Sequence, residues 1–266
     1  MGLKVLAAAA VLAATPTSYL ASHQQPDGGF AEPGGRSEPE LTAWAVLGLA
    51  VAGKAPAGAA SYLRAQPVGD AGKLALRILA LRALGEDVSA LTDRLERRRR
   101  ANGRIGPLVD TTIWSVLALR AAGHPAGKRT IRYLLRRQRP SGGWGWAPGG
   151  APDSNDTAAA VQALRAAGVR GRPIRRGVKY LLRLRGRDGG FSLVRGRASD
   201  SQSTAWAIQA LIASGRKPPR SAYRFLRRMR RPNGSYRYSA RYVTTPVFVT
   251  AQVLPALKRK PFPLRP

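Results

Sequence analysis

The chain carries two alternating patterns of apolar and polar residues, and both have helical periodicity. Residues 128–138 (KRTIRYLLRRQ) are amphipathic, with Ile131, Leu134 and Leu135 on one face at a period of about 3.6 residues. Residues 42–53 (TAWAVLGLAVAG) are apolar nearly all round. A helix without a polar stripe is surrounded by protein. The sequence therefore predicts amphipathic outer helices that alternate with buried inner helices.

Each amphipathic stretch ends in a recurring motif. The motif has Leu, then Gln or Arg four residues later, Gly four residues after that, and an aromatic or aliphatic residue two further on. Five segments show it: Leu20–Phe30, Leu95–Ile105, Leu134–Trp144, Leu181–Phe191 and Leu226–Tyr236. A sixth copy starts at Tyr62-Leu63 and decays at once. Such self-similarity is the signature of a repeat architecture.

The apolar stretches have a spacing of their own, in which Thr precedes Gly by 11 positions. It occurs at 42–53, 112–123, 157–168 and 204–215. Leu74 to Gly85 keeps the spacing without the Thr, and a copy that starts at Thr250 runs into Pro261. Ser, Thr or Asp before each stretch supplies a helix N-cap, and the closing Gly ends the helix.

Together the two patterns predict six pairs of helices, with the six inner helices parallel. The fold class is all-α, an α/α toroid (α/α barrel) of six helix-hairpin repeats. A stack of six pairs forms either an open solenoid or a closed ring. Inner helices this apolar favour closure.

Composition narrows the chemistry. The 266 residues include no Cys and two His, His23 and His124. The missing thiols exclude disulfides, thiolate zinc sites, thioester chemistry and a Cys nucleophile. We predict no metal site and no cofactor. No run of residues approaches the roughly 18 apolar positions needed to cross a bilayer.

The two ends of the chain are set apart from the repeats. Lys4 precedes the apolar stretch 5–14, which resembles a short signal peptide and predicts a secreted or cell-envelope protein. The alternative is a first helix of the repeat and a cytoplasmic protein. We expect a possible signal peptide at residues 1–14, a single toroid domain at 15–260 and a solvated tail at 261–266.

At Tyr133–Trp144 the motif resembles the QW repeat of squalene-hopene and oxidosqualene cyclases. The Gly-Gly-Phe form at 28–30 and 189–191 is similar to protein prenyltransferase β-subunits. The chain thus looks like a member of the prenyltransferase/squalene-oxidase repeat group over about residues 13–260. That group shares an α/α toroid with cobalamin carriers and complement-type thioester domains. The likeness is specific for fold and much less so for function.

The resemblance also carries a structural role for the Gln of the motif. In that family the Gln stacks on the Trp and ties the outer helix to the inner one. Gln24 and Gln138 keep this residue, whereas Arg replaces it in three copies, at residues 99, 185 and 230. An Arg plane also lies well on an aromatic ring, so the replacement is expected to preserve the role.

Residues 153–158 (DSNDTA) resemble the D-x-D-D-T-A acid motif of squalene-hopene-type cyclases, whose middle carboxylic acid protonates an alkene. The middle position here is Asn155, an amide that cannot deliver that proton. Asp153 and Asp156 are the candidate catalytic acids. The alternative is helix capping, because Asp110 and Asp200 stand at what looks like the same repeat position.

Three tryptophans, Trp44, Trp114 and Trp206, each follow the repeat Thr by two residues and so share one level of the inner ring. They predict an aromatic belt around a cavity for an isoprenoid, a corrin or a similar apolar ligand. Gln162 and Gln209, five residues after the Thr, are the candidate polar contacts. Close packing between adjacent helices explains the same positions equally simply.

Two activities of the resembled families fail on residue grounds. Protein prenyltransferases hold zinc with Asp, Cys and His, and complement-type domains need a Cys for the thioester. The chain has no Cys. Prenyl transfer by the zinc mechanism and thioester chemistry are therefore excluded.

The charge is strongly basic, with 45 Lys+Arg against 14 Asp+Glu and a net charge of +31. Arginines cluster where outer helices end, at 97–100, 136–139, 183–187 and 227–231. If all outer helices run the same way, these clusters gather on one rim of the ring. Such a rim would attract an anionic polymer, lipid headgroups or a diphosphate. Nucleic acid is a poor fit, because no aromatic-interleaved basic surface accompanies the charge.

Three functions remain. The first is a repeat domain that binds an apolar or isoprenoid-type ligand in a central cavity, without intact family catalytic motifs. The second is a terpenoid cyclase with a variant acid motif, so that whether the chain is an enzyme stays open. The third is a cell-envelope scaffold that binds polyanions through its basic rim. Squalene-type cyclases carry two such domains, and the shorter chain weighs against their complete reaction.

Overall fold

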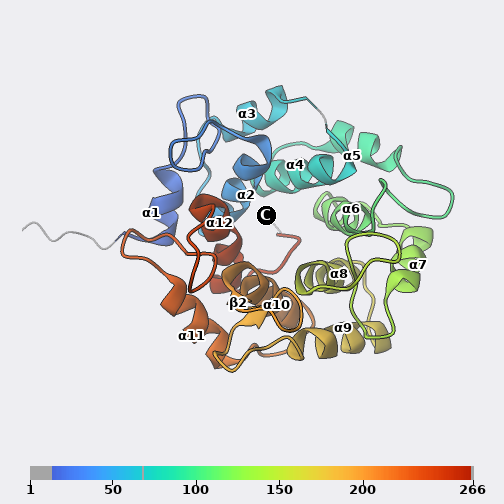
Figure 1. Cartoon of the computed structure of the whole chain (residues 1–266). Helices are drawn as coiled ribbons and strands as arrows, with labels where there is room; N and C mark the ends of the chain where they lie inside the picture. The colour runs from blue at the N-terminus through green and yellow to red at the C-terminus, as the bar shows by residue number, and fades with distance from the viewer. Residues whose placement is uncertain (1–13, 68, 265–266) are drawn as a thin grey trace, which may run out of the picture.

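The computed structural model describes residues 14–67 and 69–264. Figure 1 shows these residues as a ring of two concentric layers of helices. The inner layer consists of α2 (Pro39–Ala50), α4 (Ala71–Ala83), α6 (Val109–Ala121), α8 (Ser154–Ala166), α10 (Ser201–Ala213) and α12 (Pro246–Leu257). The outer layer consists of α1 (Pro16–Ala21), α3 (Ala59–Ala65), α5 (Ser89–Glu96), α7 (Lys128–Arg137), α9 (Arg172–Leu182) and α11 (Arg220–Met229). The predicted all-α toroid of six helix pairs is confirmed.

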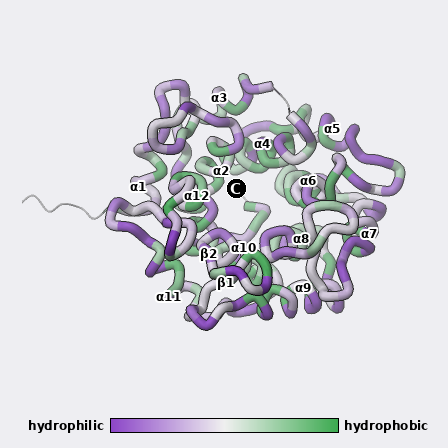
Figure 2. The backbone as a smooth tube through the Cα atoms, in the orientation of Figure 1, coloured by the Kyte–Doolittle hydropathy of each residue, from purple (hydrophilic) through white to green (hydrophobic). Residues whose placement is uncertain are grey.

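The ring is closed. Each inner helix packs on the next, and α12 packs on α2. At this last contact a Cβ on Gly48 would lie 2.8 Å from the carbonyl oxygen of Ala251, so the two helices approach backbone to backbone. Figure 2 shows that hydrophilic residues gather toward the periphery and hydrophobic residues toward the inner helices.

The repeat Thr fastens each connecting turn to its inner helix. The Thr157 hydroxyl accepts a hydrogen bond from the Trp144 backbone N–H at 2.9 Å, and the Thr204 hydroxyl accepts one from Phe191 at 2.8 Å. Thr42, Thr112 and Thr250 do the same for the equivalent residue of their own repeats. A buried backbone N–H needs a partner, which explains why the position is Thr. The only strands of the described residues, β1 (Phe191–Ser192) and β2 (Ser199–Asp200), form an antiparallel pair in one such turn.

In four of the five copies the Gln or Arg of the motif ties its repeat to the following one; the Arg185 side chain makes no such hydrogen bond with any described residue. The Gln138 side-chain amide donates to the carbonyl of Pro173 at 2.9 Å, at the start of the next outer helix. Arg99 reaches the carbonyl of Ala126 at 2.6 Å, and Arg230 reaches that of Ala14, also at 2.6 Å. Arg230 thereby joins the last repeat to the first. In these two copies Arg thus makes the same carbonyl contact as Gln. The predicted stacking of these arginines on the aromatic ring is not found: the Arg–aromatic contacts of the described residues involve residues 137, 183, 228 and 241.

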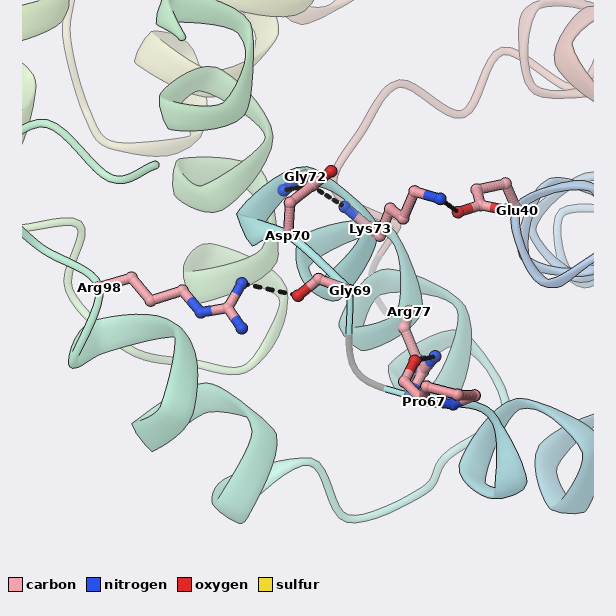
Figure 3. A network of polar contacts seen from close by, with 8 residues as sticks. All are labelled: Glu40, Pro67, Gly69, Asp70, Gly72, Lys73, Arg77 and Arg98. Carbon is pink, nitrogen blue, oxygen red and sulfur yellow. Dashed lines mark hydrogen bonds and ion pairs between the residues drawn. The ribbon is translucent and has the colours of Figure 1, made fainter. Parts of the chain in front are cut away.

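A polar network joins the first three repeats near the start of α4 (Figure 3). Lys73 pairs with Glu40 of α2 at 2.8 Å, and Asp70 accepts hydrogen bonds from the first backbone N–H groups of α4. Arg98 donates to the carbonyl of Gly69 at 2.9 Å. These contacts fix the position of α4 between its neighbours.

The C-terminal end of the described chain is part of the core. The predicted signal peptide at residues 1–14 lies outside the described residues except for Ala14. The expectation of a solvated tail is wrong for Phe262, which is 2% exposed and belongs to the core. Residues 258–264 turn back from the end of α12 into the ring, as Figure 1 shows at the C-terminal end of the trace. Among the described residues, no helix is long and apolar enough to cross a membrane.

Candidate functional site

The centre of the ring is an aromatic cluster. The ring centroids of Trp44, Trp114 and Trp206 lie 5.4, 5.5 and 5.8 Å from one another, all edge to face. Phe262 lies 5.7 to 6.4 Å from all three. Edge-to-face contacts at these separations are favourable for aromatic rings. The structure therefore brings together the three predicted tryptophans. They pack against one another and against Phe262 of the C-terminal segment, so the space predicted as a cavity inside the belt is filled.

Polar side chains of the inner helices hold this cluster in place. The Gln162 side-chain oxygen accepts a hydrogen bond from the Phe262 backbone N–H at 2.8 Å. Gln252 accepts one from the Trp206 indole N–H at 3.0 Å. Gln252 occupies the repeat position at which three other repeats carry Trp, so it supports the aromatic cluster from within it.

Gln209 has no such partner. It stands five residues after Thr204, as Gln162 does after Thr157, and so holds the equivalent position on the neighbouring inner helix. It is fully buried, and neither amide atom has a hydrogen-bond partner among the described residues. A buried amide without a partner is costly.

Carboxyl groups gather at the end of the ring where the inner helices begin. Asp153 is the N-cap of α8 and accepts a hydrogen bond from the Asp156 backbone N–H at 2.8 Å. Asp156, which is buried, has its carboxyl group next to those of both Asp110 on α6 and Asp153. Asp110 also lies near Trp114. The carboxyl cluster thereby borders the aromatic centre.

The expected equivalence of the aspartates is wrong in one respect. Asp153 and Asp200 are both N-caps, four residues before the repeat Thr, as capping predicts. Asp110 is instead the second residue of α6, two before Thr112. It therefore takes the place that Asn155 has on α8. Asp110 is a site residue that the sequence reasoning missed, although counting from the repeat Thr would have found it.

Burial determines the protonation of this cluster. Burial, and then the nearby carboxylates of Asp153 and Asp110, raise the pKa of Asp156 to about 10. Burial raises the pKa of Asp110 to about 6, although hydrogen bonds with Asp156 and Trp114 act in the opposite direction. At neutral pH Asp156 thus keeps its proton and Asp110 is mostly ionised. A neutral acid beside a carboxylate is the arrangement that two close carboxyl groups favour.

Comparison with known proteins agrees with this architecture. Residues 3–177, 110–214 and 175–245 match the sequence model of the prenyltransferase alpha-alpha toroid domain. The chain belongs to the prenyltransferase α–α toroid family. No curated protein matches this toroid chain.

Solved structures of the same fold include enzymes and a binding protein. A protein from Actinoplanes has 20% identity and a TM-score of 0.70, over 92% of this chain and 97% of its own. The type II terpene cyclase MstE from Scytonema, in complex with geranylgeranyl dihydroxybenzoate, has 16% identity and a TM-score of 0.71, over 92% and 95%. Haptocorrin in complex with Cbi has 17% identity and a TM-score of 0.60, over 92% and 66%. At these identities the likeness shows the toroid fold alone.

Proposed function

We propose that the toroid binds an apolar, isoprenoid-type molecule in the aromatic centre of its ring. The observation that carries the proposal is the position of Phe262, an apolar side chain that all three tryptophans contact. Phe262 belongs to a short segment after α12 and not to the wall of the ring. The centre of the ring is thus already occupied by an apolar side chain from the C-terminal segment. An apolar ligand would displace Phe262 and bind among the same tryptophans.

The polar groups of the centre support the same proposal. The Gln162 side-chain oxygen would accept a hydrogen bond from a donor on the ligand in place of the Phe262 N–H. Both side-chain amide atoms of Gln209 could hydrogen-bond with the ligand as well. An apolar site with few placed polar groups is typical of small-molecule pockets. An isoprenoid alcohol or a prenylated phenol has this combination of a long apolar part and one polar end.

The proposed entrance for the ligand is the end of the ring beside Asp110, where the inner helices begin. We call this end the mouth of the ring. The C-terminal segment comes from the end of α12 and fills the ring from that side, whereas Asp110 and Asp156 lie at the opposite end. Trp114 is only partly buried, while Trp44 and Trp206 are 6% and 4% exposed. A ligand entering past Trp114 would push Phe262 back toward the end of α12.

Titration with geranylgeraniol, followed by intrinsic tryptophan fluorescence, tests this function. Three of the five tryptophans line the proposed site, so saturable quenching is expected. The matched control is Tyr242→Ala, which removes an exposed aromatic outside the ring centre. Loss of the fluorescence change in Trp114→Leu but not in Tyr242→Ala supports the site. A non-saturable change that both variants retain would contradict it.

A second function, proton-initiated cyclisation, has one observation in its favour. Asp156 is a buried carboxylic acid that keeps its proton at neutral pH and lies next to Asp110, which is near Trp114. Proton transfer from Asp156 to an alkene would leave Asp156 ionised and create a carbocation, which aromatic faces stabilise. A pKa of about 10 also makes Asp156 a weak acid for this task. Ligand binding is for that reason the better supported function.

Incubation with a prenylated phenol in D2O separates the two functions. A cyclase would release a cyclic isomer with deuterium at the protonated carbon, and Asp156→Asn would abolish it. Asp188→Asn, an exposed aspartate in another turn, would leave it unchanged. Recovery of only the unchanged phenol from protein that binds it would rule out cyclisation of this substrate and leave binding intact.

A further inference from the structure

Exposed apolar side chains are confined to one part of the molecule. Four large ones are exposed in the described residues: Trp146 at 58%, Tyr242 at 51%, Val243 at 42% and Leu182 at 38%. All four lie where an outer helix ends or in the connection from an outer to an inner helix. Scattered exposed apolar residues need no explanation, but a set gathered on one face marks an interaction surface.

The hydrogen bonds of these connections place them at one end of the ring. The Trp146 carbonyl accepts from the backbone N–H groups of Val109 and Asp110 at 3.1 Å, so its loop lies over the start of α6. The Leu193 carbonyl accepts from Ser154 at the start of α8, at 2.9 Å. The Tyr238 carbonyl accepts from Ser201 at the start of α10, at 2.7 Å. We call this surface the loop rim and define it as residues 136–152, 182–198 and 227–245.

The loop rim is also where the positive charge gathers. It contains 14 Arg and one acidic residue, Asp188, a net charge of +13. Its arginines are 136, 137, 139, 183, 185, 187, 195, 197, 227, 228, 230, 231, 237 and 241. The connections at the opposite end of the ring are residues 51–58, 84–88, 122–127, 167–171 and 214–219, together with the segment 258–264 after α12. They carry seven basic and two acidic residues, a net charge of +5.

Internal ion pairing does not account for these arginines. The three ion pairs of the described residues involve Arg64, Lys73 and Arg99, all outside the loop rim. Some rim arginines hydrogen-bond to neighbouring carbonyls, such as Arg183 to Ser141 and Arg228 to Asp188. A carbonyl satisfies a donor without neutralising the charge. Arg187, Arg195 and Arg197 are exposed and make no side-chain hydrogen bond with any described residue.

We propose that the loop rim docks the toroid on the surface of an anionic lipid bilayer. Arginines supply attraction to acidic headgroups, and Trp146, Tyr242 and Val243 supply side chains that insert at the headgroup level. The exposed apolar residues favour a bilayer over a nucleic acid, because Leu182 and Val243 have nothing to contact on a phosphate backbone. This inference stands whether or not the ring centre binds a ligand.

The loop rim lies beside the mouth of the ring, so docking would affect how a ligand reaches the aromatic centre. Trp146 sits over the start of α6, next to Asp110, at the mouth of the ring. A docked toroid would therefore turn this mouth toward the lipid. A lipid-soluble molecule could pass from the bilayer to the aromatic centre without crossing water.

Flotation with vesicles of stated composition tests the proposal. The full chain is mixed with vesicles of phosphatidylcholine alone or of equal parts phosphatidylcholine and phosphatidylglycerol. We expect binding to the anionic vesicles only, weakening as salt rises. The triple variant Arg187→Ser, Arg195→Ser, Arg197→Ser is expected to bind on the order of a hundredfold more weakly, at about 1 kcal/mol for each basic residue near the surface.

A matched control removes the same charge from the opposite end. Arg170→Ser, Arg216→Ser, Lys217→Ser changes three exposed basic residues there and is expected to bind like the parent protein. Trp146 fluorescence gives a second readout: emission shifts to the blue on anionic vesicles, and the shift is lost in Trp146→Phe. Equal loss of binding in the two triple variants, or no binding to anionic vesicles, would overturn the proposal. Duplex DNA that binds the full chain while anionic vesicles do not would overturn it in favour of a nucleic acid.

Discussion

The backbone N–H of Phe262 donates to the side-chain oxygen of Gln162 at 2.8 Å, across a separation of one hundred residues. This bond places the phenyl ring among Trp44, Trp114 and Trp206. The C-terminal segment is thus an internal competitor for the place that we assign to an apolar ligand.

Phe262→Ala is expected to raise ligand affinity by ten- to a hundredfold. Burial of a Phe side chain contributes about 1.5–3 kcal/mol, here to holding the C-terminal segment in the ring centre. Removing the phenyl ring weakens this placement of the segment, which competes with the ligand. Geranylgeraniol titrations of the parent and variant measure the change. Leu264→Ala, in the same segment but not among the aromatic contacts, should have a smaller effect. An unchanged or lower affinity in Phe262→Ala would show that the segment does not compete.

Asp156→Asn is expected to stabilise the protein at alkaline pH. Because the folded-state pKa of Asp156, about 10, exceeds the value of an unfolded Asp, about 4, the folded chain holds one more proton between these values. Stability therefore falls as pH rises through this window, and a neutral Asn avoids the loss. Thermal unfolding at pH 4 and pH 9 measures it, with Asp188→Asn as the exposed control. A melting difference independent of pH would contradict the raised pKa.

Gly48→Ala is expected to destabilise the ring although Ala is the better helix former. The new Cβ would meet the Ala251 carbonyl oxygen at 2.8 Å and its Cα at 3.0 Å, so α2 and α12 must separate. Overpacking of this kind costs about 1–3 kcal/mol, against a gain of about 1 kcal/mol in helix propensity. Gly72→Ala is the control, since its Cβ would meet only side-chain atoms, at 3.2 Å or more. Denaturant unfolding compares the two variants, and equal stability would show that the α2–α12 contact is loose.

Thr157→Val is expected to cost about 1–3 kcal/mol in the free energy of unfolding, because the buried Trp144 N–H loses its partner. Thr157→Ser keeps the hydroxyl and should recover most of the loss. Urea unfolding distinguishes the two. Equal destabilisation by Val and Ser would mean that the methyl group matters and the hydrogen bond does not.

The fold could be read from the sequence because its signal is repeated. The spacing from Thr157 to Gly168 recurs in other repeats, so an error in one copy is corrected by the rest. The equal level of Trp44, Trp114 and Trp206 follows from the same count. Their mutual contacts in the structure agree with it.

What the sequence did not reveal lies outside the repeat or between its copies. Phe262 stands in a Pro-rich segment with no periodicity, and its burial depends on the space that the closed ring leaves. The pairing of Asp110 with Asp156 joins two neighbouring repeats, and no pattern within one repeat records it. Both features require the three-dimensional ring, because they depend on which side chains face each other across it.

The most direct test of the central claim is fluorine NMR of a protein carrying 4-fluorophenylalanine at position 262. The account predicts that geranylgeraniol moves this resonance from a buried to a solvent-exposed position and that the change saturates with the fluorescence titration. A resonance that stays buried while geranylgeraniol saturates its binding would contradict the claim, because the ligand would then bind elsewhere on the toroid.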